Sequence, residues 1–451
     1  MSVAAADKTR SVNEITYTDL YKRWEQNNWS AYDLDFTQDR VGWAGLSDIQ
    51  RASAMWIYSM FFYGEDAVTD GLSPYIEAAP TEEQKYFLAT QQVDEARHAV
   101  FFSRFFREVI GAGETIAEGL EFTKPQLNWG YRGAFGRLEK MFDELHADHS
   151  LPKFAQAITL YHMIIEASMA QPTQHYIEDF FAKAETMPAF SEGMENVSRD
   201  EQRHIGFGVK VLSELVNGPQ GEECKAAIAE IMREVMPYVV SVLTPPNWDR
   251  EYTRAYGFEL EDIFAFGMKA VEAKWRMIGF PLHEMPGVYP FDPEMPHRER
   301  AERQIAMLQA GFLGDPQQVV NATPEVQGYF FDVVANSADP SVLKKPMTIQ
   351  WKFSDAENFH VHLDNGSTRA VQGDAEKADV TFRTTLNEWV NVSTRGGNPR
   401  LAMLKGKVRA TGAPWKLMRL QKVFPQRPAA RDRKLDGAGN SNGASANGTS
   451  A

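Results

Sequence analysis

Cysteine is nearly absent from this chain, since Cys224 is the only one among 451 residues. A single cysteine can form no intrachain disulfide and cannot build a thiolate cage around a metal ion. Long apolar runs are missing as well, because none reaches the roughly 18 residues that a membrane-spanning helix needs. The N-terminus also lacks the hydrophobic core of a secretory signal. These absences favour a soluble protein of a reducing compartment, which we expect to be the cytoplasm.

Positive charge is in short supply. The chain has 47 Lys and Arg against 61 Asp and Glu, which gives a formal net charge of −14 at pH 7. No basic stripe stands out, which disfavours nucleic acid as a partner. The hydrophobic content of 43% is ordinary for a globular protein, and the length is sufficient for two or three domains with separate cores.

The hydrophobic pattern of the first part of the chain is helical. Up to about residue 285, apolar residues recur at the 3.6-residue spacing of amphipathic helices. The longest predicted helices cover residues 53–76, 82–110, 153–184 and 189–216. Prolines become frequent between residues 281 and 297, which indicates the end of a domain. We therefore expect an all-α bundle in this part of the chain.

The pattern changes to a two-residue alternation after about residue 320. It predicts strands at 347–354, 358–366 and 378–385, with a hairpin turn at "DNG", and short helices follow. The second domain should therefore be a smaller α+β unit. The predicted division is a helical domain at 1–285, a linker with a helix at 286–319, the α+β domain at 320–425 and a disordered low-complexity tail at 426–451.

Two of the long helices carry the same motif. "DEARH" and "DEQRH" each contain Glu-x-x-His, as Glu95 with His98 and as Glu201 with His204. Residues three apart on a helix share one face, so each pair can reach one metal ion. In a four-helix bundle, two such helices and one Glu from each of the other two hold a pair of metals.

The two remaining carboxylates should lie inside apolar helices upstream of the motifs. Glu65 in "SMFFYGEDAV" and Glu166 in "YHMIIEASMA" fit this requirement. A carboxylate among apolar neighbours is costly unless it is paired or binds a cation. A lone Glu-x-x-His is common on solvated helix faces, but two copies with matching upstream Glu residues favour a dinuclear site. Four carboxylates and two imidazoles suit iron or manganese.

Polar neighbours of the motifs should orient the ligands. Asp94 and Asp200 each precede a ligand Glu, and each could accept the outer N–H of the ligand His on the opposite helix. Arg97 and Arg203 would then neutralise these aspartates. No organic cofactor is expected.

These residues resemble the ferritin-like superfamily, in the branch that contains the small subunit of class I ribonucleotide reductase. That subunit keeps a radical tyrosine four residues after its first ligand His, where this chain has Phe102. The resemblance therefore implies the fold and the dinuclear site but no tyrosyl radical at this position.

A nearer resemblance is to the reductase-small-subunit-like ligand-binding oxidases. Their pattern places a Val three residues after the first Glu and a Tyr five residues before the third, joined by an ether cross-link; here these are Val68 and Tyr161. The resemblance implies a manganese/iron site, with manganese held by Glu65, Glu95 and His98. It also implies oxygen activation and a long-chain fatty acid at the metals. "DEARH" paired with "DEQRH" also resembles the hydroxylase subunits of bacterial multicomponent diiron monooxygenases, which carry two irons and need reductase and regulatory partners.

The region from about 320 to 425 resembles the sterol carrier protein type 2-like fold, which implies an apolar lipid tunnel. We therefore expect an oxygen-activating dinuclear oxidase that performs two-electron C–H oxidation on a fatty-acid-like or lipid-like substrate. An external electron donor and a homodimer are further expectations. The alternatives are a diiron hydroxylase, a ferritin-type iron store, and a lipid-binding protein whose metal is only structural.

Overall fold

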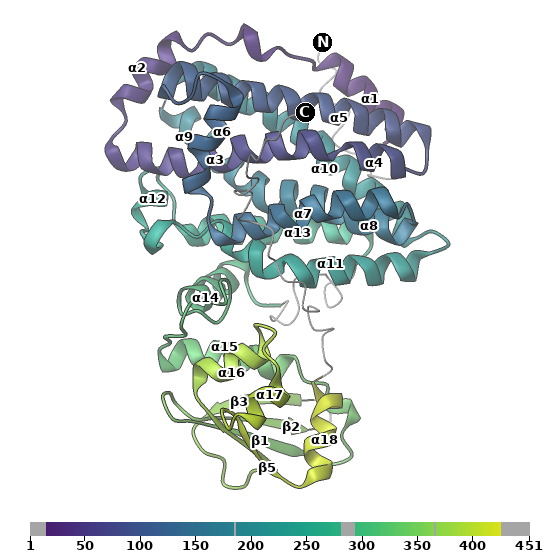
Figure 1. Ribbon diagram of the computed structural model, residues 1–451, viewed down its shortest axis with the longest axis vertical. Coiled ribbons are helices and arrows are strands. Elements are labelled where there is room, and N and C mark those ends of the chain that lie inside the picture. The colour runs from purple at the N-terminus through teal and green to yellow at the C-terminus, as the bar shows by residue number, and fades with distance from the viewer. Residues whose placement is uncertain (1–14, 185, 281–293, 365–366, 425–451) are drawn as a thin grey trace, which may run out of the picture.

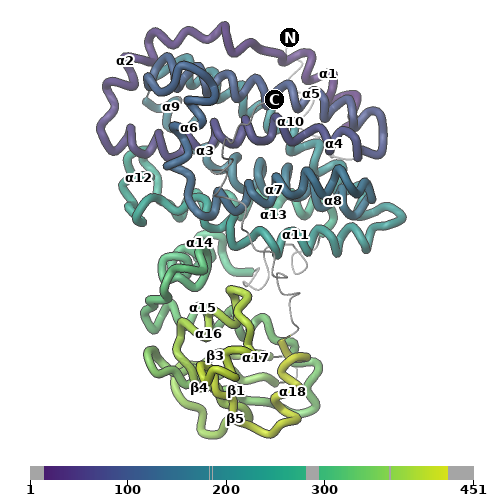
Figure 2. Tube along the Cα trace, in the orientation of Figure 1, coloured from purple at the N-terminus to yellow at the C-terminus, as the bar shows by residue number. Residues whose placement is uncertain are grey.

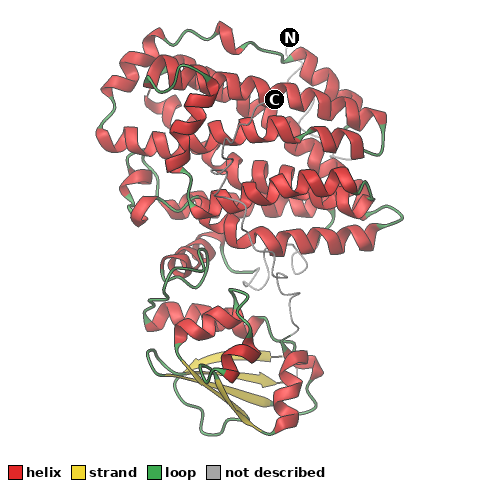
Figure 3. Cartoon of the chain, in the orientation of Figure 1, coloured by secondary structure: helices red, strands yellow, loops and turns green. Residues whose placement is uncertain are grey.

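The computed structural model describes residues 15–184, 186–280, 294–364 and 367–424. A large helical region forms one end of the molecule, and a smaller domain forms the other. The helix α14 (His297–Gln309) lies between them (Figure 1). The chain runs through the helical region first and reaches the small domain last (Figure 2). All strands drawn belong to the small domain (Figure 3).

The helical region is built mainly from long helices. Its α-helices are α1 (Tyr17–Gln26), α2 (Thr37–Gly45), α3 (Asp48–Gly71), α4 (Ser73–Ala78), α5 (Glu82–Phe105), α6 (Ile116–Thr123), α7 (Trp129–Ala147), α8 (Leu151–Ile158), α9 (Gln171–Ala184), α10 (Pro188–Val216), α11 (Gly221–Val242), α12 (Glu251–Arg254) and α13 (Leu260–Ile278). Two further segments have the wider π-helical turn, η4 (Phe106–Ile110) and η6 (Thr159–Ala170). Short 3₁₀ turns are η3 (Ala31–Asp33), η5 (Lys124–Gln126) and η7 (Pro246–Trp248).

Local signals explain where the central helices begin. The Ser47 side chain accepts a hydrogen bond from the backbone N–H of Gln50, and the Gln50 side chain accepts one from the backbone N–H of Ser47. This capping box starts α3. The Thr81 side chain starts α5 by accepting a hydrogen bond from the backbone N–H of Gln84. α3 packs along α5, α10 packs along η6, and α5 contacts α10. These four elements surround the centre of the bundle.

Two predicted helices differ from the observed ones. The segment 53–76 does not run through as one helix, because it breaks after Gly71 and restarts as α4 with Pro74 in its first turn, a position that proline tolerates. The segment 153–184 is not α-helical throughout, because its middle is the π-helical η6. The helices predicted at 82–110 and 189–216 correspond to α5 with η4 and to α10.

The small domain is a five-stranded mixed sheet with helices. Its elements are α15 (Pro324–Asn336), η9 (Pro340–Val342), β1 (Met347–Phe353), β2 (Phe359–Asp364), β3 (Ser367–Gln372), β4 (Val380–Thr384), α16 (Leu386–Ser393), α17 (Pro399–Leu404), β5 (Arg409–Gly412) and α18 (Pro414–Val423). The strand order is β3-β2-β1-β4-β5, and only β1 and β4 pair in parallel. β2 and β3 pair antiparallel, but the predicted turn at 365–366 lies outside the described residues, as does the predicted tail.

Separate apolar cores support the two parts. Buried side chains of the central helices form two large clusters, one of which contains both Val68 and Tyr161. The small domain has its own core around Trp351 and Phe331, which Met307 of α14 joins. None of the helices in the described part of the chain combines the length and the hydrophobicity that crossing a bilayer requires.

Candidate metal centre

The four central elements direct carboxylates and imidazoles to one buried place. Ligand-type atoms of Glu65, Glu95, His98 and Glu201 lie within 4.8 Å of one another, and we call this set the first cluster. The corresponding atoms of Glu95, Glu166, Glu201 and His204 also lie within 4.8 Å of one another and form the second cluster. Glu95 and Glu201 belong to both clusters. All six side chains that the sequence analysis singled out as ligands are therefore brought together and buried.

Each histidine points one ring nitrogen into its cluster. His98 Nδ1 lies 3.3 Å from Glu65 Oε2 and 3.3 Å from Glu95 Oε2. His204 Nδ1 lies 3.2 Å from Glu95 Oε1 and 3.6 Å from Glu166 Oε1. In both cases Nδ1 faces the carboxylate oxygens, so it is the atom available for a metal ion.

The other ring nitrogen of each histidine faces an aspartate on the opposite helix. His98 Nε2 lies 3.3 Å from Asp200 Oδ2, and His204 Nε2 lies 3.1 Å from Asp94 Oδ2. These are the cross-helix contacts that the sequence analysis expected. A carboxylate that accepts the Nε2 proton leaves Nδ1 with its lone pair free for a cation.

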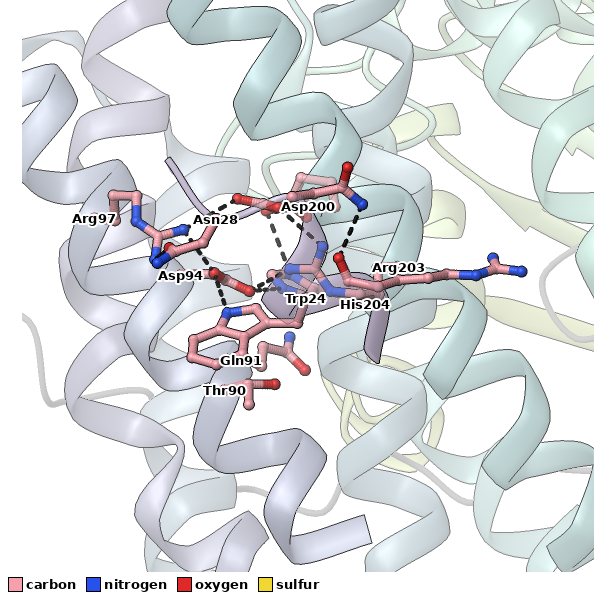
Figure 4. A network of polar contacts seen from close by, with 12 residues as sticks. Trp24, Asn28, Thr90, Gln91, Asp94, Arg97, Asp200, Arg203 and His204 are labelled. Atoms are coloured by element: carbon pink, nitrogen blue, oxygen red, sulfur yellow. Dashed lines mark hydrogen bonds and ion pairs between the residues drawn. The ribbon is translucent and has the colours of Figure 1, made fainter. Parts of the chain in front are cut away.

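Arginines and tryptophans complete this outer layer (Figure 4). Arg97 donates to Asp94 at 3.0 Å, and Arg203 donates to Asp200 at 3.0 Å and also contacts Asp94. The sequence analysis did not find the two indole donors, Trp24 Nε1 to Asp94 Oδ1 and Trp29 Nε1 to Asp200 Oδ2, both at 2.9 Å. They come from the N-terminal segment, which packs over α5 and α10 and bears no motif.

Gln91 is a further polar residue that the sequence analysis missed. Its Nε2 donates to Glu166 Oε1 at 2.8 Å, and its Oε1 lies 3.0 Å from His162 Nε2. Burial lowers the pKa of His162 to about 3, so this imidazole is neutral and can donate to Gln91. Gln91 stands one turn before Glu95 on α5, and this i, i+4 spacing is the only signal that could have found it.

Burial sets the charge states of the carboxylates. It raises the pKa of Glu65 to about 8, raises that of Glu166 well above its ordinary value, and also raises that of Glu201. Burial opposes ionisation of Glu95 too, but the charges of His204 and His98 hold the Glu95 pKa well below its ordinary value. So many acids in one apolar place need positive charge nearby.

The imidazoles supply that charge in the metal-free protein. Burial alone would lower the pKa of His98 and of His204, but the Glu65 and Glu95 carboxylates raise the two pKa values well above the ordinary one. A divalent cation between the same groups would replace these protons, since histidine and carboxylate bind metals in their deprotonated forms.

Unsatisfied atoms show that the residues present fit a metal. Among the described residues, Glu166 Oε2, Glu201 Oε2 and His204 Nδ1 are buried without a hydrogen-bond partner. Buried polar atoms are almost always paired, and three orphans at one place are the donor atoms that a hard or borderline cation takes.

A mostly apolar cavity opens beside the carboxylates. Its wall includes Glu65, Glu95, Glu166 and Glu201 on one side, and Val68 and Tyr161 both line it. The other lining residues are Ile57, Met60, Phe61, Gly64, Tyr131, Phe135, Ile165, Met169, Ala170, Thr173, Val242 and Leu243. Tyr161 donates to Glu95 Oε1 at 2.6 Å, and burial raises its pKa well above the ordinary value, so the phenol stays neutral.

The π-helical turn of η6 explains how Tyr161 and Glu166 share this cavity. The two residues are five apart, which places them on different faces of an α-helix. A π-helix closes each turn on residue i+5, so residues five apart stack over one another. Such turns occur frequently at functional sites, and here the wide turn aligns a phenol and a carboxylate.

Residues 11–239, slightly more than half of the chain, match the family model described as "Ribonucleotide reductase, small chain". The chain therefore belongs to the ribonucleotide reductase small-chain family, and its helical region is ferritin-like. Phe102, four residues after His98, is fully buried and stacks on Phe61 at 5.7 Å.

Solved structures of R2-like ligand-binding oxidase variants resemble this chain. Two variants with an aerobically reconstituted Mn/Fe cofactor share 27% and 26% sequence identity with it, with TM-scores of 0.52 and 0.51. A third, with an anaerobically reconstituted Mn/Fe cofactor, shares 27% identity with a TM-score of 0.50. Each match covers 59% of this chain and 94% or 95% of the other chain.

The small domain matches a different family model. Residues 315–429 fit the one described as "Alkyl sulfatase C-terminal". The predicted change to an α+β domain after residue 320 is confirmed by its small mixed sheet, whereas the likeness to sterol carriers stays a prediction.

Proposed function

We propose that the helical region holds a dinuclear metal centre and oxidises a hydrophobic substrate with O₂. One observation carries this proposal: two overlapping sets of buried carboxylates and imidazoles share Glu95 and Glu201. Two carboxylates common to both sets suit a pair of metals at short separation. The family membership and the Mn/Fe cofactor of the solved neighbours support the same assignment.

The proposed ligands divide between two metal positions. Glu65 and His98 serve the first position, Glu166 and His204 serve the second, and Glu95 and Glu201 lie between them. The donor set of oxygen and imidazole nitrogen admits iron and manganese. We propose Mn/Fe, as in the solved neighbours, with manganese at the first position; Fe/Fe is the alternative that the same ligands allow.

A metal pair of this kind supplies the ability to reduce O₂ and to oxidise a C–H bond by two electrons. The protein holds the reacting groups and keeps water away from them. The aspartates fix the imidazole orientation through the Nε2 contacts, and Tyr161 holds Glu95 by a hydrogen bond. The apolar walls around Ile165 and Met169 exclude water from the carboxylates. An external electron donor is part of this proposal.

The apolar cavity defines the proposed substrate class. Only its carboxylate wall is charged, so a long-chain acid or a similar amphiphile could place its polar end at the metals and its chain along Phe61, Ile165 and Val242. Solvent extraction of the purified full-length protein, followed by mass spectrometry, tests this class. About one co-purified long-chain amphiphile per chain would support it, and only polar compounds or none would count against it.

The Val68–Tyr161 pair is the proposed site of an ether cross-link. Both side chains are buried and line the same cavity. The link would join the phenol oxygen to a valine carbon and remove two hydrogens, which O₂ would accept. It would therefore record that the centre has reacted once.

Metal content and intact mass test the proposal together. The protein is expressed with both metals available, exposed to air, and analysed for manganese and iron per chain. About one of each, with a loss of two hydrogens in peptides containing Val68 and Tyr161, is the expected result. Two irons without a mass change would favour a diiron hydroxylase with a separate reductase. Absence of both metals would refute the dinuclear assignment.

The small domain is proposed to bind or deliver the same hydrophobic substrate. Its fusion to the oxidase region and its resemblance to lipid carriers motivate this role, and its family match alone does not assign a ligand. Binding of a fluorescent fatty acid to the full-length protein tests it. If Trp351→Ala lowers the binding while thermal unfolding shows that the small domain is still folded, and a cavity-filling Met169→Trp leaves the binding unchanged, the result would support a second lipid in the small domain.

A further inference from the structure

The end of the small domain has an unusual charge. The protein as a whole has a net charge of −14, yet no acidic residue occurs from Trp389 to Phe424. The same stretch contains the basic residues Arg395, Arg400, Lys405, Lys407, Arg409, Lys416, Arg419 and Lys422. The expectation that the chain has no basic stripe is therefore wrong for this segment, because the overall acidic composition conceals one local cationic region.

Large apolar side chains are exposed within this cationic region. On α17, Leu401 is 47% exposed and Leu404 is 85% exposed, and Met403 lies between them at 44%. On α18, Trp415 is 55% exposed and Met418 is 68% exposed. Exposed apolar groups of this size are expected singly on a protein surface, and five of them within eighteen residues indicate a binding surface. We call these five residues, together with Arg400, Lys405, Lys407, Arg409, Lys416, Arg419 and Lys422, the α17–α18 face. Arg395 is not part of it, because it donates to the backbone carbonyls of Gly311, Pro316 and Gln318.

Both helices have a buried side that fixes which residues point outward. Leu417, Leu420 and Phe424 of the α18 segment pack against the core of the domain, and Ala402 does so from α17. Trp415 and Met418 are three residues apart and occupy the opposite stripe of α18. In Figure 1, α17 lies in front of the sheet of the small domain and α18 lies at the side of the sheet.

Several cations of the α17–α18 face have no acidic partner. Lys407 pairs with Glu388 at 2.9 Å, and Lys416 pairs with Asp379. Arg419 lies over the Trp415 ring at 6.0 Å. Within the described part of the chain, Arg400, Lys405, Arg409 and Lys422 form no ion pair. Their charge is therefore available to an external anion.

The mixture of residues favours a lipid surface over a protein partner. Lysine is depleted in the centre of protein interfaces, where it would have to lose its water. Membrane-surface segments, in contrast, combine Trp and Leu with Lys and Arg, because the apolar groups enter the acyl boundary while the cations stay at the headgroups. The long Lys and Arg stems also tolerate this placement.

We propose that the α17–α18 face docks on an anionic lipid membrane surface, with Leu404, Trp415 and Met418 inserted and the basic residues at the headgroups. Each Lys or Arg near an anionic surface contributes to binding, and each inserted side chain adds apolar burial. The inference does not depend on the metal centre. Docking would place the small domain where hydrophobic molecules are found.

Vesicle co-sedimentation of the full-length protein tests this proposal. The probes are vesicles of phosphatidylcholine alone and of phosphatidylcholine mixed with phosphatidylglycerol, used with metal-free and with metal-loaded protein. We expect binding to the anionic vesicles only, equal for both forms, and weakened by salt. Met418→Ser and Lys405→Glu should each weaken it by about tenfold.

Matched controls keep the result specific. Met277→Ser removes a methionine of similar exposure, 50%, from α13, and Lys344→Glu reverses an exposed lysine elsewhere in the small domain. Both should bind as the unchanged protein does, and thermal unfolding should show that all variants are folded. Equal binding of Met418→Ser and Met277→Ser would overturn the proposal. The proposal would also be overturned if the protein self-associated without vesicles and Met418→Ser abolished this self-association. The α17–α18 face would then bind a second copy of the chain.

Discussion

The two clusters of the metal centre have the same residue types but different surroundings. In the first cluster, Glu65 extends from a regular α-helix and lies against His98. In the second, Glu166 extends from the π-helical η6, and Gln91 donates to it. Among the six described ligand side chains, the buried atoms without a hydrogen-bond partner are Glu166 Oε2, Glu201 Oε2 and His204 Nδ1. All three belong to the second cluster, although Glu201 also belongs to the first.

This difference indicates that the two metal positions are not equivalent. A cation in the first cluster must replace the contact between His98 and Glu65. A cation in the second cluster must replace the contact between His204 and Glu95, but it also meets Glu166 Oε2, which has no hydrogen-bond partner. The cost of desolvating an ion is repaid better where fewer existing contacts are lost. We therefore expect the second cluster to bind the first equivalent of metal.

Removing one carboxylate charge at a time should produce the largest effects. Glu95→Gln affects both clusters, and we expect the variant to retain almost no metal. Glu65→Gln and Glu166→Gln each affect one cluster, so about one metal ion per chain should remain, because the other cluster keeps all its ligands. Elemental analysis of the purified proteins measures this, with Glu83→Gln on the exposed side of α5 as the control.

Equal metal loss in Glu95→Gln and Glu65→Gln would contradict the sharing of Glu95. Glu65→Gln leaves the second cluster intact, and Glu166→Gln leaves the first intact. If Glu65→Gln keeps its metal ion at a lower free metal concentration than Glu166→Gln does, the second cluster binds metal more tightly.

Substitutions of the two aspartates should each weaken metal binding at one position only, and by less than the loss of a ligand does. Asp94 orients His204 and Asp200 orients His98, so Asp94→Asn should weaken the second position and Asp200→Asn the first. Loss of such an outer contact typically lowers metal affinity about 10–100-fold. Competition with a chelator measures the affinities, with Trp24→Phe and Trp29→Phe as milder variants that remove only the indole donors. Identical behaviour of Asp94→Asn and Asp200→Asn at both positions would contradict the crossed assignment.

The ligand positions were predictable because their chemistry leaves a pattern. Glu-x-x-His places both side chains on one helix face, and a Glu such as Glu166 within "MIIEASM" conflicts with its apolar neighbours unless something binds it. The helix bounds followed from the 3.6-residue period, yet α7 was overlooked although Tyr131, Leu138, Met141 and Leu145 have that period.

Other parts of the site had no such signal. An apolar sequence does not distinguish the turn of η6 from an α-helix, so the shared orientation of Tyr161 and Glu166 could not be predicted. Trp24 and Trp29 reach the aspartates only through tertiary packing of the N-terminal segment. The α17–α18 face was missed because composition averages over the whole chain.

Gln91 offers a test of stability that concerns mainly the second cluster, because it donates to Glu166 at 2.8 Å and to the shared Glu95 at 3.3 Å. In the metal-free protein, Gln91→Leu would remove the donor to Glu166 and leave the His162 ring without its partner. Buried groups that lose their partners cost about 1–3 kcal/mol each, so the free energy of unfolding should fall by that order. Chemical denaturation measures it, and the neighbouring Gln92→Leu, which loses only half-buried and exposed contacts to Thr69 and Ser73, should change it less.

The smallest effect should come from a lysine that adjoins the helix of the second cluster. Lys274 on α13 donates to Gln171, the first residue of α9 after η6, and burial lowers the Lys274 pKa from 10.5 to about 8. Between those two pH values the unfolded chain binds a proton that the folded chain has released, so the free energy of unfolding rises with pH across this window. Below about pH 8 both states are protonated, and the folded state bears the cost of a partly buried charge.

Lys274→Met should therefore be the more stable protein at pH 7 and should lack the rise between pH 8 and 10.5. Because the side chain is only half-buried, water screens the charge and the gain should be on the order of 1 kcal/mol. Burial raises the pKa of several tyrosines, but these groups act in both proteins, so the difference between the two unfolding curves isolates Lys274. Lys269→Met, an exposed lysine on the same helix, should run parallel to the unchanged protein. If the pH dependence of the free energy of unfolding were also the same for Lys274→Met and the unchanged protein, the Lys274 ammonium would be solvated. Its charge next to the end of η6 would then not destabilise the folded state.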